Sequence, residues 1–348
     1  MHVSSTRRAN SQRKKEHLDI VLSKSVVFDG LSTGLENCWF VHQALPEIDL
    51  AEIDLSMSLT GKVLKAPLLI SSMVGGIEAA RPINQRLAEA AQTLGIAMGV
   101  GSQRCAIDDP RVAVTYQVRN IAPDIPLFAN LGAVQLNYLY GVDECKRVVD
   151  MIEADALVLH LNPLQEALQE GGNTNFSGLL ANIEKVCREI TVPVFVKEVG
   201  YGISENVACK LAGIGVAGID VTGAGGTSWS EVERHRTGSR ANIASSFASW
   251  GIPTAESVQM GRRGAPLLTL IASGGIRNGI DVAKSIALGA DMAGMAAPLL
   301  KAASLSAKAV MTALEEIIET LRICMFCIGA ANLGELKNSP FLKKEGRW

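Results

Sequence analysis

The segment Ser273-Gly-Gly-Ile-Arg-Asn-Gly279, which follows a short apolar run, carries the sharpest chemical signal in this sequence. Its glycines let the backbone approach an oxyanion, and the amides at the start of a following helix favour negative charge. Ala296 and Ala297 close the next apolar run and extend the same kind of surface. The two segments together predict a binding site for a monophosphate.

A lysine at the end of another apolar run predicts an anionic ring nearby. Lys197 closes Pro193-Val-Phe-Val-Lys197, and a lysine buried there needs an anionic partner. The N1/O2 edge of a reduced flavin would be such a partner. Ser102, Asn130 and Thr222 close other runs and offer the hydroxyl and amide groups that a flavin ring requires. We therefore expect FMN to bind.

Eight short apolar runs supply these endings, and segments with helical apolar spacing separate them. In such a pattern the strands form a parallel sheet that is covered by helices or closed into a barrel. Eight units within residues 67–300 favour the (β/α)₈ TIM barrel, and a doubly wound open sheet is the alternative. The runs are 67–73, 96–102, 126–130, 156–162, 193–197, 218–222, 267–273 and 290–296.

A barrel brings all eight strand endings around one mouth. Seven of the eight endings carry polar or ionisable groups. Each of them, taken alone, is more often a structural cap than a functional group. Their convergence on one mouth favours a binding site.

Three regions lie outside the regular repeat. Residues 1–66 are predicted to be an N-terminal extension, with a basic arm followed by extended segments that cap the barrel floor. A long insertion of about 228–265 follows the sixth strand and is typical of a lid or an interface element. Residues 301–348 are predicted to form a long helix and a polar tail.

Composition excludes several partners. The formal net charge of −2 provides no overall field for nucleic acid, and no run reaches the ~18 apolar residues of a membrane span. We expect neither partner, and we expect a cytoplasmic location, because the basic N-terminus lacks a secretory core. The seven cysteines are scattered through apolar patterns and are typical of reduced thiols. Cys324 and Cys327 are expected to pack in a helix, with a zinc or redox pair as the alternative.

Several motifs together resemble the type 2 isopentenyl diphosphate isomerases over about residues 12–335. They are Arg13-Lys-Lys-Glu-His17, Ser72-Met-Val-Gly-Gly76, Gly101-Ser-Gln-Arg104, His160-Leu-Asn-Pro-Leu-Gln-Glu166, Val196-Lys-Glu-Val-Gly200, Thr222-Gly-Ala-Gly-Gly-Thr-Ser-Trp229 and Ser273-Gly-Gly-Ile-Arg277. The first and fourth are the most discriminating, since many FMN barrels share the glycine loop. The resemblance implies interconversion of isopentenyl and dimethylallyl diphosphate in isoprenoid precursor synthesis. It also implies reduced FMN, Mg²⁺, NAD(P)H as reductant, and a homotetramer or larger assembly.

The resemblance also implies roles for particular residues. Glu166 would hold Mg²⁺, and His160, Asn162 and Gln165 would be catalytic. The diphosphate substrate would meet Arg13, Lys14, Ser102, Gln103, Arg104 and Gln165. FMN would contact Ser71, Ser72, Met73, Ser102, Asn130, Lys197, Thr222, Thr227, Gly275, Ile276, Arg277, Ala296 and Ala297.

Chemical reasoning agrees with these roles, because moving a double bond requires a proton to be delivered to one carbon and removed from another in a dry pocket. The basic arm would ordinarily be a solvated tail, and the resemblance reverses that expectation for Arg13 and Lys14 alone. The alternative functions are an FMN-dependent hydroxy-acid oxidase or dehydrogenase and a non-catalytic flavin-binding barrel. The oxidase would need a histidine in 222–227, where this chain has none.

Overall fold

A closed barrel of eight parallel strands forms the centre of the protein, in the order β10-β11-β4-β5-β6-β7-β8-β9. The computed structural model describes residues 2–236 and 240–344, the first ten of them by backbone alone. Seven of the eight barrel strands lie within the predicted runs, and β6 extends two residues beyond its run, so the predicted TIM barrel is confirmed and the open sheet is excluded. The strands are β4 (Leu68–Ile70), β5 (Ala97–Gly99), β6 (Leu127–Gly132), β7 (Ala156–His160), β8 (Val194–Lys197), β9 (Gly218–Asp220), β10 (Thr269–Ala272) and β11 (Met292–Met295).

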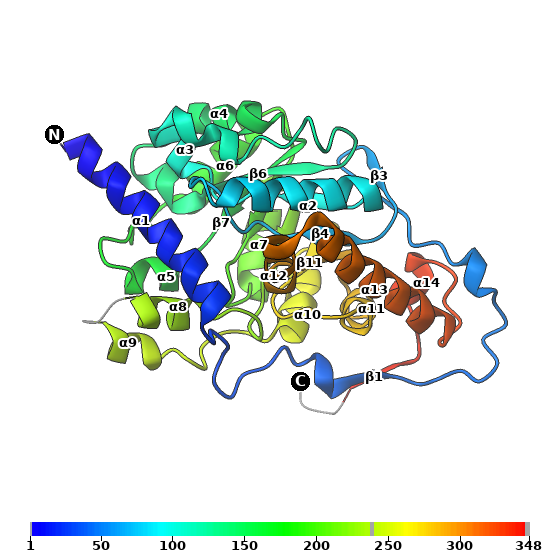
Figure 1. Cartoon of the computed structure of the whole chain (residues 1–348). Coiled ribbons are helices and arrows are strands. Elements are labelled where there is room, and N and C mark those ends of the chain that lie inside the picture. The colour runs from blue at the N-terminus through cyan, green and yellow to red at the C-terminus, as the bar shows by residue number, and fades with distance from the viewer. Residues whose placement is uncertain (1, 237–239, 345–348) are drawn as a thin grey trace.

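Helices alternate with these strands and cover the outside of the barrel (Figure 1). No helix in the described ranges is long and apolar enough to cross a membrane. The α-helices are α1 (His2–Ser23), α2 (Ala80–Leu94), α3 (Arg104–Asp108), α4 (Val142–Ile152), α5 (Pro163–Leu168), α6 (Leu179–Glu189), α7 (Glu205–Ala212), α8 (Trp229–Arg236), α9 (Ala241–Ser245), α10 (Thr254–Gly264), α11 (Gly279–Ala287), α12 (Ala297–Leu305), α13 (Ala307–Phe326) and α14 (Leu333–Lys337). Short 3₁₀ turns are η1 (Leu35–Asn37), η2 (Leu50–Glu52), η3 (Pro110–Thr115) and η4 (Ala133–Asn137).

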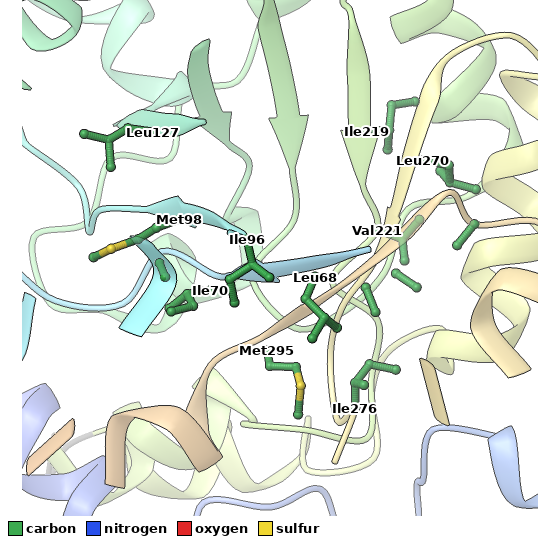
Figure 2. Close-up of a cluster of buried hydrophobic side chains, with 14 of the residues drawn as sticks. Leu68, Ile70, Ile96, Met98, Leu127, Ile219, Val221, Leu270, Ile276 and Met295 are labelled. Carbon is green, nitrogen blue, oxygen red and sulfur yellow. The ribbon is translucent and has the colours of Figure 1, made fainter. Parts of the chain in front are cut away.

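The outward-facing strand residues form the main hydrophobic core with the helices. Successive strand residues point to opposite faces, so Leu68 and Ile70 of β4 face the helices while Leu69 faces the barrel interior. Ten buried members of this outer core are labelled in Figure 2. Burial on both faces explains why the strands read as continuous apolar runs.

The lower half of the barrel interior is filled by apolar side chains. Phe128 and Phe195 meet edge to face at its centre, with ring centroids 5.1 Å apart. A hairpin of β2 (Met57–Leu59) and β3 (Lys62–Leu64) inserts Leu59 and Leu64 into this cluster from below. This hairpin closes the floor of the barrel.

The upper half of the interior differs in chemistry. On each strand, the residue two positions after the lower apolar residue faces inward again, at the C-terminal end. We call these eight residues the upper ring: Ser71, Gly99, Asn130, His160, Lys197, Asp220, Ser273 and Gly294. The strands thus carry their polar side chains to the mouth, where TIM barrels place their active sites.

The predicted basic arm forms helix α1, which lies along one side of the barrel and packs on α8 (Figure 1). Glu233 of α8 has a fully buried side chain and accepts hydrogen bonds from His17 Nε2 at 2.9 Å and Arg236 at 2.7 Å. Arg236 also pairs with Glu16 of α1 at 3.1 Å. Burial raises the pKa of Glu233, but the contacts with His17 and Arg236 outweigh it and hold the pKa below its ordinary value. This ionic cluster holds α1 against the barrel.

The remaining predicted regions differ in detail from the sequence expectations. The span 228–265 includes α10, which packs on α7 and β10 as a regular barrel helix, so the additional material of that span is α8, α9 and their connections. In the C-terminal region α13 is the long helix, and Cys324 lies within its last turn while Cys327 caps it. Strand β12 (Leu342–Lys344) then pairs antiparallel with β1 (Cys38–Phe40), which joins the two ends of the chain.

Candidate active site at the barrel mouth

His160 is held in one orientation at the mouth by its neighbour in the upper ring. Its Nδ1 lies 2.8 Å from Asn130 Oδ1, an acceptor, so Nδ1 carries the proton and Nε2 is left as an acceptor. Burial, together with Lys197, Lys14 and Arg104, lowers the pKa of His160 to about 3. The imidazole is therefore neutral at physiological pH and can orient a ligand without carrying charge.

Lys197 and Asp220 face each other in register on β8 and β9. Lys197 Nζ donates to Glu198 O at 2.6 Å, and burial lowers the pKa of the lysine while Asp220 and Glu198 oppose that effect. Burial raises the pKa of Asp220, against the opposing effect of Lys197. The barrel interior thus contains a cation and an anion side by side.

Asn162, Gln165 and Glu166 are brought together by the short helix α5. Asn162 Nδ2 donates to Gln165 Oε1 and to Glu166 Oε1, each at 3.1 Å. Glu166 Oε2 accepts from the Asn173 amide at 2.6 Å, so the carboxylate is fixed from both sides. Asn162 Oδ1 is buried without a hydrogen-bond partner among the described residues. Buried acceptors are usually hydrogen-bonded, so this oxygen is a candidate contact for a ligand donor.

Two arginines from distant segments lie close to this carboxylate. The pKa of Arg13 is lowered by burial and by Arg104, while Glu166 raises it. Arg104 donates to Asn173 Oδ1 at 3.1 Å. Two arginines beside a single carboxylate leave an excess of positive charge, which favours binding of an anion with several charges.

Lys14 is placed differently from what the sequence predicts. Its Nζ is hydrogen-bonded to Gly75 O at 2.9 Å, to Ser102 O at 2.7 Å and to Tyr116 Oη at 2.7 Å. All three donor positions of the ammonium are used, so Lys14 docks α1 onto the loops after β4 and β5. Burial lowers its pKa.

Gln103 also serves the scaffold. Its side chain is fully buried, donates to Val148 O at 2.8 Å and accepts from the Asn130 amide at 3.0 Å. These bonds tie β6 to α4 and occupy both ends of the side-chain amide. The structure therefore does not support the predicted contact between this side chain and the substrate.

The two glycine-rich loops pack against each other, backbone to backbone. A Cβ on Gly274 (φ 98°) would lie 2.0 Å from Gly223 O, and one on Gly226 would lie 2.5 Å from the Gly275 amide. The glycines are therefore required by this loop contact as well as by any approach of a ligand. Ile276 is buried in the outer core, which leaves its backbone as the part that could meet FMN (Figure 2).

The other predicted flavin contacts surround the same mouth. Ser71 Oγ is buried and has no hydrogen-bond partner among the described residues. Thr222 adopts φ 38°, an uncommon conformation for a β-branched residue. The remaining predicted contacts follow strands or open helices: Ser72 and Met73 after β4, Ser102 after β5, Thr227 before α8, Arg277 before α11, and Ala296 and Ala297 at the start of α12.

Comparison with known proteins agrees with this site. Residues 154–343 match the family model described as FMN-dependent dehydrogenase. An isopentenyl-diphosphate delta-isomerase of Nostoc sp. is 53% identical over 334 residues, which cover 95% of each chain. A protein of the same name from Synechocystis sp. is 53% identical over 335 residues, which cover 96% of each chain. The chain belongs to the type 2, FMN-dependent isopentenyl-diphosphate delta-isomerase family.

Solved structures that resemble this isomerase-family chain share only its fold. A mandelate oxidase variant with an FMN adduct superposes with a TM-score of 0.65 at 17% identity, covering 98% of this chain and 99% of its own. A flavocytochrome b2 variant with bound sulfite gives a TM-score of 0.67 at 18% identity, covering 98% and 85%. At such identities, the shared feature is the barrel.

The residues of the upper ring fit the flavin of the isomerase family. Among the described residues, the Ser71 hydroxyl has no hydrogen-bond partner, and Lys197 offers a partly buried cation that a reduced, anionic ring would neutralise. Both residues point into the barrel from strands on opposite sides of the mouth. Sequence reasoning gave no role to Asp220, Tyr116 or Asn173. Of these, Asp220 carried a signal, because it is a carboxylate inside an apolar run.

Proposed function

We propose that this chain interconverts isopentenyl diphosphate and dimethylallyl diphosphate by a 1,3-allylic proton shift, with reduced FMN and Mg²⁺, for isoprenoid precursor synthesis. The observation that carries the proposal is the cluster of Asn162, Gln165 and Glu166 beside two arginines, directly above the upper ring. An anion-binding edge next to the polar upper ring matches a substrate with a charged diphosphate and an apolar alkene beside a flavin.

Glu166 would hold Mg²⁺ together with diphosphate oxygens. In the described ranges no group of three or more His, Cys, Asp or Glu side chains forms a metal cluster. A single carboxylate is enough when the substrate supplies the other oxygens, which is the usual mode for Mg²⁺. Arg13 and Arg104 would then neutralise the remaining diphosphate charge, and the planar guanidinium groups can bind its oxygens in pairs.

His160, Asn162 and Gln165 would act on the alkene part of the substrate. His160 presents Nε2 as an acceptor, and Asn162 presents a free carbonyl oxygen. Gln165 is partly buried, and its amide can bind a ligand without a change of charge. Bound reduced FMN would supply the group that gives and takes the proton. The three side chains would orient the substrate toward it, while α1 excludes water above them.

The finer features of the cofactor cycle and assembly are part of the same proposal. NAD(P)H would reduce the flavin, since isomerisation consumes no electrons and FMN must be charged once. We also propose a cytoplasmic homotetramer or larger assembly, which light scattering of the purified protein tests directly.

An anaerobic assay tests the function. Purified protein with FMN, Mg²⁺, dithionite or NADPH and isopentenyl diphosphate should yield dimethylallyl diphosphate, and omission of the reductant or of Mg²⁺ should stop the reaction. Oxidation of lactate or mandelate without isomerisation would replace this function by that of a hydroxy-acid oxidase. Flavin binding without either reaction would favour a non-catalytic barrel.

A further inference from the structure

Asp220 is the one carboxylate of the upper ring, and no role in the proposed reaction has been given to it. It faces inward from β9, is almost completely buried, and lies in register with Lys197 of β8. A buried carboxylate requires either a counter-charge or several hydrogen bonds. Asp220 has both.

The hydrogen bonds of Asp220 all converge on one oxygen. Oδ1 accepts from Ser273 Oγ at 2.5 Å, from the Thr222 amide at 3.2 Å and from Thr222 Oγ1 at 3.1 Å. Two of these donors belong to Thr222, whose φ of 38° is costly for a β-branched side chain. The carboxylate therefore stabilises a strained turn at the end of β9.

The charge of Asp220 is available to Lys197. The other carboxylate near that lysine, Glu198, is occupied by the amides of Val199, Gly200 and Tyr201 through its Oε2 at 2.5 to 2.6 Å. Burial lowers the pKa of Lys197, and Asp220 provides the larger of the two opposing effects. The third ionisable member of the ring, His160, is neutral. Asp220 is thus the main counter-charge inside the barrel.

We propose that Asp220 is a positioning residue of the flavin site. Its carboxylate keeps Lys197 protonated and holds Thr222 in the left-handed conformation, so that both residues are ready for the cofactor. The first half of this inference rests on the proposed function, because it requires Lys197 to face bound FMN. The second half concerns the turn alone and holds without the cofactor.

Binding of reduced FMN tests the charge. Asp220→Asn retains an oxygen that can accept from Ser273 and Thr222, but it removes the counter-charge of Lys197. We expect the ratio of variant to wild-type dissociation constants for photoreduced FMN to rise at least about tenfold between pH 6 and 9, as the lysine loses its proton. For oxidised FMN the ratio should stay nearly flat. In a Lys197→Met background the same substitution should show no such rise.

A ratio that is independent of pH while FMN remains bound overturns the role of Asp220 and leaves the proposed function intact. Failure of the wild-type protein to bind FMN overturns the proposed function instead. Ser273→Ala is the matched control, because it removes a hydrogen bond to the carboxylate and keeps the charge. Its ratio should not change with pH.

Thermal unfolding of the FMN-free protein tests the turn. Asp220→Ala removes the oxygen that accepts from the Thr222 amide and hydroxyl, and it should lower the melting temperature. In a Thr222→Gly background the same substitution should cost clearly less, because glycine adopts positive φ without support. Equal costs in the two backgrounds would overturn the role of Asp220 in the turn.

Discussion

The two ends of the barrel differ in how completely their charged side chains are paired. At the lower rim, Asp155 precedes β7 and Asp291 precedes β11. Asp155 binds Lys62 at 2.8 Å and Arg119 at 2.6 Å, and it accepts from the backbone amide that starts β6 at 2.8 Å. Asp291 repeats the arrangement with Arg262, Lys337 and the Leu270 amide of β10. Each carboxylate thus forms two ion pairs and accepts a hydrogen bond from one strand amide, so both charges at the lower rim are fully paired.

At the upper rim, several charged and polar groups remain incompletely paired. Arg13 lies beside Arg104, and neither Asn162 Oδ1 nor Ser71 Oγ has a hydrogen-bond partner among the residues that the structure describes. These arrangements lower the stability of the free protein and reserve binding capacity for ligands. The lower rim therefore stabilises the fold, and the upper rim would bind ligands. Substitutions at the lower rim should mainly lower the melting temperature, and substitutions at the upper rim should mainly impair binding and turnover.

The largest effect is expected at Glu166. Glu166→Gln keeps the size of the side chain and removes the charge that would hold Mg²⁺, so turnover should fall on the order of a hundredfold or more while FMN stays bound. Steady-state assays across a Mg²⁺ series and the flavin absorbance measure the two properties. Glu170→Gln, an exposed position in the same segment, is the control and should be silent. Loss of flavin in Glu166→Gln would assign Glu166 to the cofactor instead.

A pair of arginines compares the two rims directly. Arg13→Met should raise the KM for the diphosphate substrate by about ten- to a hundredfold and should not lower the melting temperature, because it relieves repulsion by Arg104. Arg119→Met should do the reverse, since Arg119 pairs with Asp155 and binds four backbone carbonyls. Kinetics and thermal unfolding of both variants decide the matter. The same signature in both would remove the distinction between the rims.

The third prediction concerns the pH dependence of the stability that Asp155 provides. Burial raises the pKa of Asp155, but Lys62, the Leu127 amide and Arg119 outweigh it and hold the pKa below its ordinary value. A depressed carboxylate pKa stabilises the folded state above the unfolded pKa of about 4, and that stability is lost as pH falls through the folded value. Asp155→Asn should therefore cost about 1–3 kcal/mol at pH 7 and little near pH 2. Urea unfolding at a series of pH values measures this, and a constant difference would contradict it.

The smallest effect is expected at His160. With a pKa of about 3, the imidazole gains no proton between pH 5 and 9. His160→Gln should lower turnover without moving the pH profile in that range. Nitrogen NMR of the imidazole should show the proton on Nδ1, toward Asn130, throughout. A titration near pH 6.5 would contradict the neutral assignment.

Much of the fold was readable because each barrel strand is buried on both faces. The segments Leu68–Ile70 and 194–196 are continuously apolar, and the polar residues that follow them mark the mouth. The inward residue at the mouth follows from the two-residue period, which selects Asp220 and Ser273. Sequence reasoning instead took Thr222, the last residue of the run, and so missed the carboxylate.

Other features were out of reach because their partners lie far apart in the chain or belong to the backbone. Lys14 binds Gly75 O and Ser102 O, and a sequence offers no signal for a carbonyl acceptor. Gln103 stands beside Arg104 in the sequence, yet it is bonded to Val148 and Asn130 within the scaffold. Adjacent loop residues can thus differ in role, one binding within the scaffold and the other facing the site. Their spacing in the sequence does not show which is which.

The hairpin that carries Leu59 and Leu64 makes the barrel a vessel with a single opening. A ligand seated against the upper ring can leave only past the loops and α1, so whatever lies deepest must enter first and depart last. Under the proposed function, the flavin would therefore load first and be retained, whereas substrate and product would exchange above it at every turnover. The hairpin lies far from the mouth, yet by closing the floor it makes the cofactor and the substrate share one entrance.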